Sequence, residues 1–284
     1  QRYWPRCIAV NGYVNVEGKK MSKRFGNVIA LRDVLLKYGS DVVRANLITS
    51  AEDMNDADWR EERIGSIMKR IAFLFKVVKQ LEKAKRGEEN LQDKYLLSII
   101  HANLDEIREL YEQTKFRSAF ELAFFKLIAE LEKYIARNSG IENCNKKTLK
   151  ESLEILIKVL TPILPHICEE LWQMLGNDGF VALVEFPKKD ESKIDENALK
   201  IAKAFESTLE DIANILKVAG EKRKLFLYFA SEAEKQFFEE TKEYIKQRYN
   251  FDSVELFMAN ESGIYDPLNK AKKAKVGKPG IYLE

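Results

Sequence analysis

The sequence predicts a mainly α-helical protein that ends in a small α/β domain. Apolar residues recur at spacings of three and four through residues 61–187, as on the buried face of a helix. After about residue 220, short runs of β-branched and aromatic residues replace that pattern, as in strands. The pattern therefore changes twice along the chain, which predicts domains at 1–60, 61–187 and 188–284.

Residues 1–60 are expected to form a mixed domain. "IAVNGYVNVE" carries β-branched residues around Asn11-Gly12, which predicts a hairpin turn. "VIALRDVLLKYGSDVVRANLITSA" predicts two short helices broken at Gly39-Ser40. A cationic segment lies between these parts.

Residues 61–187 are expected to form an antiparallel helix bundle. Four long amphipathic stretches follow one another with short connections, which is the pattern of such a bundle. Pro162 and Pro165 predict a break before "HICEELWQMLG", because proline cannot continue a helix. "FVALVEFPKKDESK" then predicts an exit strand and a linker.

Residues 188–284 are expected to form the α/β domain. A helix over about 197–218 precedes the strand "KLFLYFA", a helix that Ser231 would cap, and the strand "SVELFMA". The final residues, "GIYLE", predict a third strand.

Composition excludes several classes of protein. The 284 residues carry a net charge of only +2, so any nucleic-acid surface must come from local clusters of cations. Apolar runs are short and interrupted, which argues against a membrane span. Cys7, Cys144 and Cys168 are far apart and no metal-ligand spacing is present, so no metal site is expected. The same cysteine pattern predicts a protein of the reducing cytoplasm. The start at Gln1 suggests a piece of a longer chain.

The segment "KKMSKRFGN" suits phosphate binding. Lys20 and Lys23 bracket two residues, so their ammonium groups can converge on one polyphosphate if the backbone turns. Gly26 frees the backbone, and the Asn27 side chain can close the turn. On charge alone, a solvated basic turn is the simpler alternative.

This segment resembles the KMSKS loop of class I aminoacyl-tRNA synthetases, with Arg24 where the family usually has Ser. "LTPILPHICEELWQMLG" resembles the anticodon-binding bundle of the leucine, valine and isoleucine subgroup, the class Ia type. "AEDMNDADWRE" and the closing "DPLNKAKKAKVGKPGIYLE" are most similar to archaeal-type leucyl-tRNA synthetases. The same piece of a valyl or isoleucyl enzyme, or a free-standing tRNA-binding module, stays open as an alternative.

The resemblance implies specific roles. In the family the loop closes over ATP, used with Mg²⁺, while the amino acid attacks the α-phosphate. Lys20 and Lys23 would then stabilise the departing pyrophosphate, and Met21, Ser22 and Arg24 would complete the ATP-binding loop. Residues 1–60 would be the end of the catalytic domain with its stem-contact helices. The family's His-x-Gly-His-like motif is absent, so the rest of the catalytic domain is an expected partner and the isolated chain is expected to be inactive.

A second cationic cluster lies in the closing segment. These lysines are interleaved with Ala, Gly and Pro rather than Glu, so no neighbour in sequence neutralises them. A flexible cationic segment contacts phosphates without reading sequence; a solubilising tail is the alternative. The resemblance implies binding to leucine tRNA at its long variable arm. The residues assigned to tRNA are Lys270, Lys272, Lys273, Lys275 and Lys278.

Other candidates have structural interpretations. The acidic run Glu52 to Asp58 is expected to be a solvated loop that caps the next helix, with Trp59 as a packing anchor. His166 is expected to be structural, and the stripe Phe116, Phe120 and Phe124 to be core.

Overall fold

The computed structural model describes residues 4–5, 8 and 10–284. Cys7 lies outside the described residues. So does part of the first strand of the hairpin expected around Asn11-Gly12. The chain divides into two compact units that each draw on separate stretches. The first comprises Gln1–Glu82, Ala102–Glu130 and Leu149–Lys189; the second comprises Lys83–His101, Leu131–Thr148 and Asp190–Glu284. The three-domain division at 60 and 187 stays a prediction.

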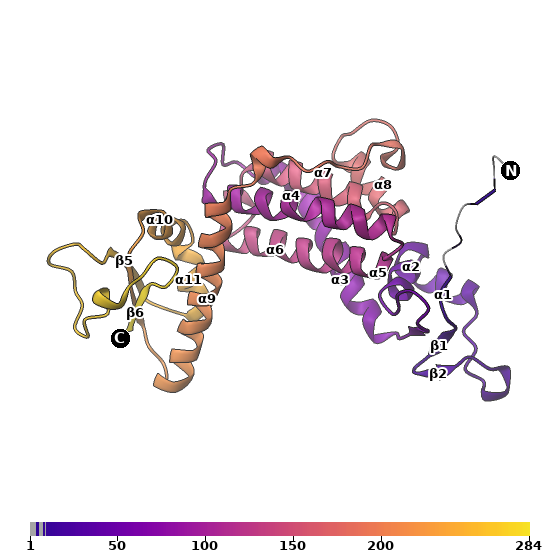
Figure 1. Ribbon diagram of the computed structural model, residues 1–284, viewed down its shortest axis with the longest axis horizontal. Helices are drawn as coiled ribbons and strands as arrows, with labels where there is room; N and C mark the ends of the chain where they lie inside the picture. Colours follow the sequence, from indigo (N-terminus) through magenta and orange to yellow (C-terminus); the bar gives the residue numbers. More distant parts are fainter. Residues whose placement is uncertain (1–3, 6–7, 9) are drawn as a thin grey trace. The chain divides into compact units, whose positions relative to one another are not determined.

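The predicted mainly α fold is confirmed, and Figure 1 shows long helices through the middle of the chain with small sheets in the N-terminal and C-terminal parts. The helices up to residue 174 are α1 (Leu31–Tyr38), α2 (Ser40–Ile48), α3 (Glu62–Gln80), α4 (Leu91–Glu112), α5 (Phe116–Phe120), the π-helical η3 (Glu121–Leu127), α6 (Ile128–Arg137), α7 (Lys146–Leu160) and α8 (Pro165–Met174). None of the described helices is both long and apolar enough to cross a membrane.

Within the first unit, apolar faces pack as their spacing predicts. α3 packs against α2 and α8, and the Tyr111 hydroxyl on α4 donates to the Val159 carbonyl of α7 at 2.9 Å. α8 begins at Pro165, so the predicted break is present. Phe120 and Phe124 are fully buried and stack at 4.6 Å. Phe116 is 40% exposed, so the expectation that it is core was wrong.

The first sheet has the order β2-β1-β3. Its strands are β1 (Val14–Val16), β2 (Lys19–Lys20) and β3 (Ala57–Trp59). The turn lies at Glu17-Gly18, where both residues have positive φ (50° and 74°), and not at the expected Asn11-Gly12. The reason is that β1 finds its second partner in β3, about 40 residues further on, and this parallel pairing fixes which residues are strand.

The exit strand expected in "FVALVEFPKKDESK" was also a wrong prediction, because this segment forms no strand. It contains only the short 3-10 turns η5 (Val181–Leu183) and η6 (Glu191–Lys193), because the described chain offers it no strand to pair with. Instead, the Phe186 ring packs edge-on against Tyr111 at 6.1 Å.

The second unit contains the α/β domain. The long helix α9 (Glu196–Ala219) and the helices α10 (Glu232–Glu240) and α11 (Lys242–Tyr249) accompany a sheet of order β5-β4-β6. The strands are β4 (Lys224–Phe229), β5 (Ser253–Met258) and β6 (Gly280–Leu283), so the predicted third strand is present. Ser231 precedes α10, but its side chain makes no capping hydrogen bond.

One face of this sheet supplies the core of the second unit. Leu225, Leu227 and Phe229 alternate toward the helices and are fully buried with Phe205 of α9 and Phe237 of α10. Because every second residue of β4 faces this core, the register of the sheet is fixed. The opposite face carries Phe226 and Tyr228.

Candidate functional site

The cationic loop leaves the first sheet through the β1–β2 hairpin. The Gly18 N–H donates to the Asp58 carboxylate at 2.8 Å, and the Glu17 N–H donates to the Trp59 carbonyl at 3.2 Å. Burial alone would raise the pKa of Asp58, but the hydrogen bonds from Gly18 and the Arg60 guanidinium lower it. The acidic run was expected to cap the next helix, but the N-cap residue of α3 is Glu61 and makes no side-chain capping hydrogen bond. Asp58 instead fixes the base of the loop.

Inside the loop, the Asn27 side chain forms a clasp. Its Oδ1 accepts from the Ser22 N–H at 2.8 Å, and its Nδ2 donates to the Lys20 carbonyl at 3.1 Å. Ser22 caps the 3-10 turn η1 (Lys23–Phe25) by accepting from the Arg24 N–H at 3.2 Å. The predicted closing role of Asn27 is confirmed. Gly26 has φ 66° and open space around its Cα, so it supplies a left-handed conformation and not a close approach.

The loop cations differ in their surroundings. The Lys20 ammonium lies 4.2 Å from the centre of the Tyr13 ring, a cation–π contact. The side chains of Lys23 and Arg24 are exposed and make no hydrogen bond or ion pair within the described chain. Arg24 contributes to the loop through its backbone N–H, so this hydrogen bond does not depend on its side chain. Sequence reasoning missed Tyr13, since its partner is set by the pairing of β1 with β2.

His166 takes part in the capping of α8, as its expected structural role requires. Its Nδ1 lies 2.8 Å from Asp41 Oδ1, and the other oxygen of this buried carboxylate accepts from the Ile167 N–H at 2.8 Å. Asp41 therefore caps α8 from the start of α2. The Arg44 guanidinium donates to the Pro162 and Ile163 carbonyls, both at 2.9 Å. Sequence reasoning missed Asp41 and Arg44, which lie more than 100 positions from the residues that they bind.

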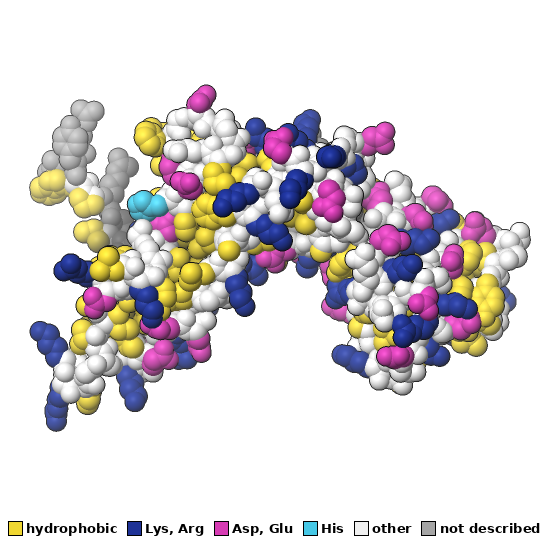
Figure 2. All heavy atoms as spheres, turned by 180° about the vertical axis from the view of Figure 1, so that it is seen from behind, with side chains coloured by type: hydrophobic (Ala, Val, Ile, Leu, Met, Phe, Trp, Pro, Cys, Tyr) yellow, Lys and Arg dark blue, Asp and Glu magenta, His cyan; other side chains and the backbone are white. Residues whose placement is uncertain are grey.

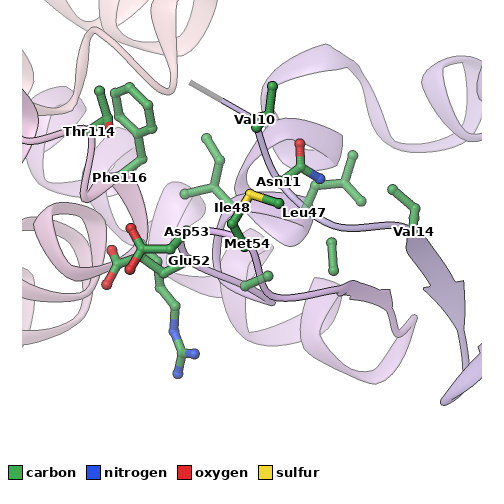
Figure 3. A pocket seen from close by; sticks show the side chains of 13 residues that line it. Val10, Asn11, Val14, Leu47, Ile48, Glu52, Asp53, Met54, Thr114 and Phe116 are labelled. Carbon is green, nitrogen blue, oxygen red and sulfur yellow. The ribbon is translucent and has the colours of Figure 1, made fainter. Parts of the chain in front are cut away.

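An apolar pocket of about 520 Å³ lies beside the start of β1 (Figure 3). Val10, Leu47, Met54 and Phe116 line it. The acidic residues at its edge are already engaged: Glu52 accepts from the Ser118 N–H and hydroxyl at 2.9 and 2.8 Å, and Asp53 pairs with Lys115. Their carboxylates therefore hold the start of α5 and are not a free pair for acid–base chemistry.

The lysines of the closing segment lie on an ordered lobe, which we define as residues 266–278 and call the lysine lobe. The Asp266 carboxylate accepts from the Lys270 and Ala271 N–H groups at 2.7 and 2.8 Å. Lys275 and Lys278 exchange backbone hydrogen bonds of 3.0 and 2.9 Å. The expectation of a flexible segment was wrong, because these bonds fix the backbone.

A buried carboxylate holds the tip of the lysine lobe. The Gly277 N–H donates to Glu234 Oε1 of α10 at 2.6 Å. Glu234 is 3% exposed, and burial raises its pKa although the Gly277 hydrogen bond opposes this. Lys272, Lys273, Lys275 and Lys278 are exposed, and none of them forms an ion pair within the described residues. The lysine lobe therefore has a hydrogen-bonded backbone and exposed lysines whose charges no described carboxylate pairs with.

Comparison with known families matches two parts of the chain. Residues 1–71 match the family described as "tRNA synthetases class I (M)", and residues 93–228 match the "Anticodon-binding domain of tRNA ligase". The chain thus belongs to the class I aminoacyl-tRNA synthetases, as the loop and the helical fold predicted.

Within this class, the chain is similar to archaeal leucine–tRNA ligases. It is 36% identical over 224 residues to that of Archaeoglobus fulgidus, covering 79% of this chain and 23% of the relative. It is 35% identical over 236 residues to that of Methanocaldococcus jannaschii, covering 82% of this chain and 24% of the relative. The chain spans about a quarter of the length of these curated relatives.

A solved structure shares the fold. It is the ternary complex of Agrobacterium radiobacter LeuRS with tRNA and LeuAMS, with a TM-score of 0.54 and 23% identity, covering 65% of this chain and 24% of that one.

Proposed function

We propose that this chain is the carboxyl-terminal part of a leucyl-tRNA synthetase, which attaches leucine to its tRNA through an aminoacyl-adenylate made from ATP. The observation that carries the proposal is the Asn27-clasped cationic loop within the stretch that matches class I synthetases. The leucine assignment is supported by the archaeal relatives. Charging of tRNA would place the protein in the cytoplasm.

In this proposal the loop acts on the triphosphate of ATP. As the leucine carboxylate attacks the α-phosphate, negative charge builds on the departing pyrophosphate, and Lys20 and Lys23 stabilise it. Lys23 is free to do so at once, whereas Lys20 must first leave the Tyr13 ring. Met21, Ser22 and Arg24 complete the ATP-binding turn. Residues 19–27 contain no carboxylate, so Mg²⁺ would arrive on the phosphates and not on this loop.

The remaining parts are proposed to bind tRNA. Residues 1–60 would end the catalytic domain and contact the tRNA stem, 61–187 would form the anticodon-binding-type bundle, and 188–284 the terminal tRNA-binding domain. The lysine lobe would contact phosphates of the long variable arm. The support is the set of unpaired cations on the lobe and the match to an anticodon-binding domain.

The catalytic proposal is tested by Lys23→Ala in the intact enzyme. Removing one charge-stabilising group from a preorganised site typically costs a factor of about 100–1,000 in rate, so ATP–pyrophosphate exchange should fall by about that factor. Lys19→Ala, which removes an exposed lysine of β2 just before the motif, is the matched control and should have a much smaller effect. Unchanged exchange in Lys23→Ala would contradict the assigned role.

The tRNA proposal is tested with this chain alone by fluorescence anisotropy against leucine, valine and serine tRNAs. A leucine tRNA without its variable arm completes the set. Preference for the full leucine tRNA supports the proposal, whereas equal affinity for all four leaves only generic RNA binding.

A further inference from the structure

A groove runs between the end of α9 and the lysine lobe. Its volume is about 540 Å³, within the range of small-ligand clefts. Lys270, Lys273 and Lys278 line one wall, and Pro279 and Ile281 continue it at the start of β6. All of these residues, and those of α9 opposite them, belong to the second unit.

The opposite wall is one face of α9. Asp211, Asn214, Ile215 and Val218 are spaced i, i+3, i+4 and i+7, so they share one side of the helix. The other side, with Phe205 and its neighbours, is already buried in the core. Val218 is 91% exposed and Ile215 is 36% exposed. Two aliphatic side chains are therefore open to solvent beside three lysines.

This groove is built before any ligand arrives. The Asp266 carboxylate fixes the backbone at Lys270, and Glu234 fixes it at Gly277. Gly280 closes the wall tightly, because a Cβ there would lie 2.4 Å from the Lys270 carbonyl oxygen. The lysines thus start from a fixed backbone, which lowers the ordering cost of binding.

We propose that this groove holds one unstacked nucleotide of an RNA. The combination of walls selects this ligand: cations attract the phosphates, an apolar surface contacts the face of the base, and polar groups meet its edge. Ile215 and Val218 contact the base. The Asp211 carboxylate accepts from an exocyclic amino group, and the Asn214 carboxamide both donates and accepts.

The charge pattern favours RNA over an acidic peptide. Three lysines without ion pairs within the described chain complement closely spaced phosphates. A peptide carboxylate would use the lysines, whereas a nucleotide also places a flat base against Ile215 and Val218. The inference rests on the proposed RNA binding and adds to it a specific site and a requirement for an unpaired nucleotide.

The test uses this chain and two RNA hairpins that differ only by one bulged nucleotide. Anisotropy titrations at two salt concentrations compare the parent with Val218→Ser, Lys273→Gln and Lys272→Gln. Because Val218 is 91% exposed, its replacement leaves the core unchanged. Lys272 is the matched control, since it neighbours Lys273 but does not line the groove.

The parent should bind the bulged hairpin more tightly. Val218→Ser should weaken that binding by about fivefold, as expected for loss of roughly one buried methylene or methyl contact, and leave binding of the unbulged hairpin unchanged. Lys273→Gln should weaken bulged binding more than Lys272→Gln. AMP should compete with the bulged hairpin in the parent, and about fivefold more AMP should be needed for the same competition in Val218→Ser.

Other outcomes overturn the inference separately from the proposed function. Equal binding of both hairpins, with equal losses from the two lysine variants, refutes the groove while RNA binding stands. Competition by an acidic peptide that is as strong in Val218→Ser as in the parent also refutes it, because charge alone would then explain binding. No affinity for any RNA, including leucine tRNA, refutes both.

Discussion

Replacing Asn27 by Ala removes both hydrogen bonds of the clasp across the cationic loop. The Ser22 N–H loses its acceptor at 2.8 Å, and the Lys20 carbonyl loses its donor at 3.1 Å. Each such bond contributes about 1 kcal/mol net, so the loop should be destabilised by about 2 kcal/mol. Since 1.4 kcal/mol is a factor of ten, the open state of the loop should become about 30 times more populated.

The assay is hydrogen exchange of the Ser22 amide, followed by NMR in this chain. Exchange should be about 30-fold faster in Asn27→Ala, while global stability in urea stays unchanged because the loop is exposed. Asn27→Asp keeps the acceptor for Ser22 and should show a smaller effect. Asn11→Ala is the control, since that carboxamide donates only to the neighbouring Gly12 carbonyl. If Ser22 exchanges at the same rate in Asn27→Ala and Asn11→Ala, the clasp does not order the loop.

Two further predictions concern the second unit. Asp93→Asn removes the charge opposite the Arg86 guanidinium, which binds this fully buried carboxylate at 2.6 and 2.9 Å. Breaking a buried pair typically costs 3–5 kcal/mol, so the free energy of unfolding measured in urea should fall by about 3 kcal/mol and the midpoint should move to lower urea. An unchanged midpoint would refute this. Glu234→Gln keeps the acceptor for Gly277 but cannot ionise. Because burial raises the pKa of folded Glu234 above 4.5, its contribution to stability is full below pH 4.5 and is lost as the pH rises through the folded pKa. The variant should therefore gain stability relative to the parent as pH rises above 4.5. Thermal unfolding across that range checks this, and a difference that is constant with pH would contradict it.

Local patterns predicted most of the helical architecture. The apolar spacing of α3, α4 and α7 and the proline break before α8 were confirmed, because both depend on residues within a turn or two. The prediction from aromatic spacing that Phe116 is core was wrong. Helix periodicity identifies the apolar face of a helix, but it does not show how far along that face neighbouring elements pack. The π-helical turn η3 in the same region had no sequence signal.

The strands depended on partners that the sequence does not identify. The β1–β2 turn moved to Glu17-Gly18 because β3 pairs with β1. The run before Phe186 stayed irregular because no described strand accepts it.

The sequence by itself determined the chemistry of the candidate loop: the order of Lys20, Ser22, Lys23 and Asn27 predicted a cationic turn closed by a side chain. These residues lie within eight positions, so local hydrogen bonds suffice to form the turn. Only the tertiary structure placed the Lys20 ammonium on the Tyr13 ring, since that contact depends on strand pairing.

The tertiary structure also decided that the closing lysines are an ordered lobe and not a flexible tail. The residue responsible is Glu234, whose carboxylate lies 43 positions from Gly277 in sequence and binds its N–H directly. A buried carboxylate must be paired with a hydrogen-bond donor, and here the fold supplies the Gly277 N–H. The composition of the closing segment does not indicate that Glu234 is its partner.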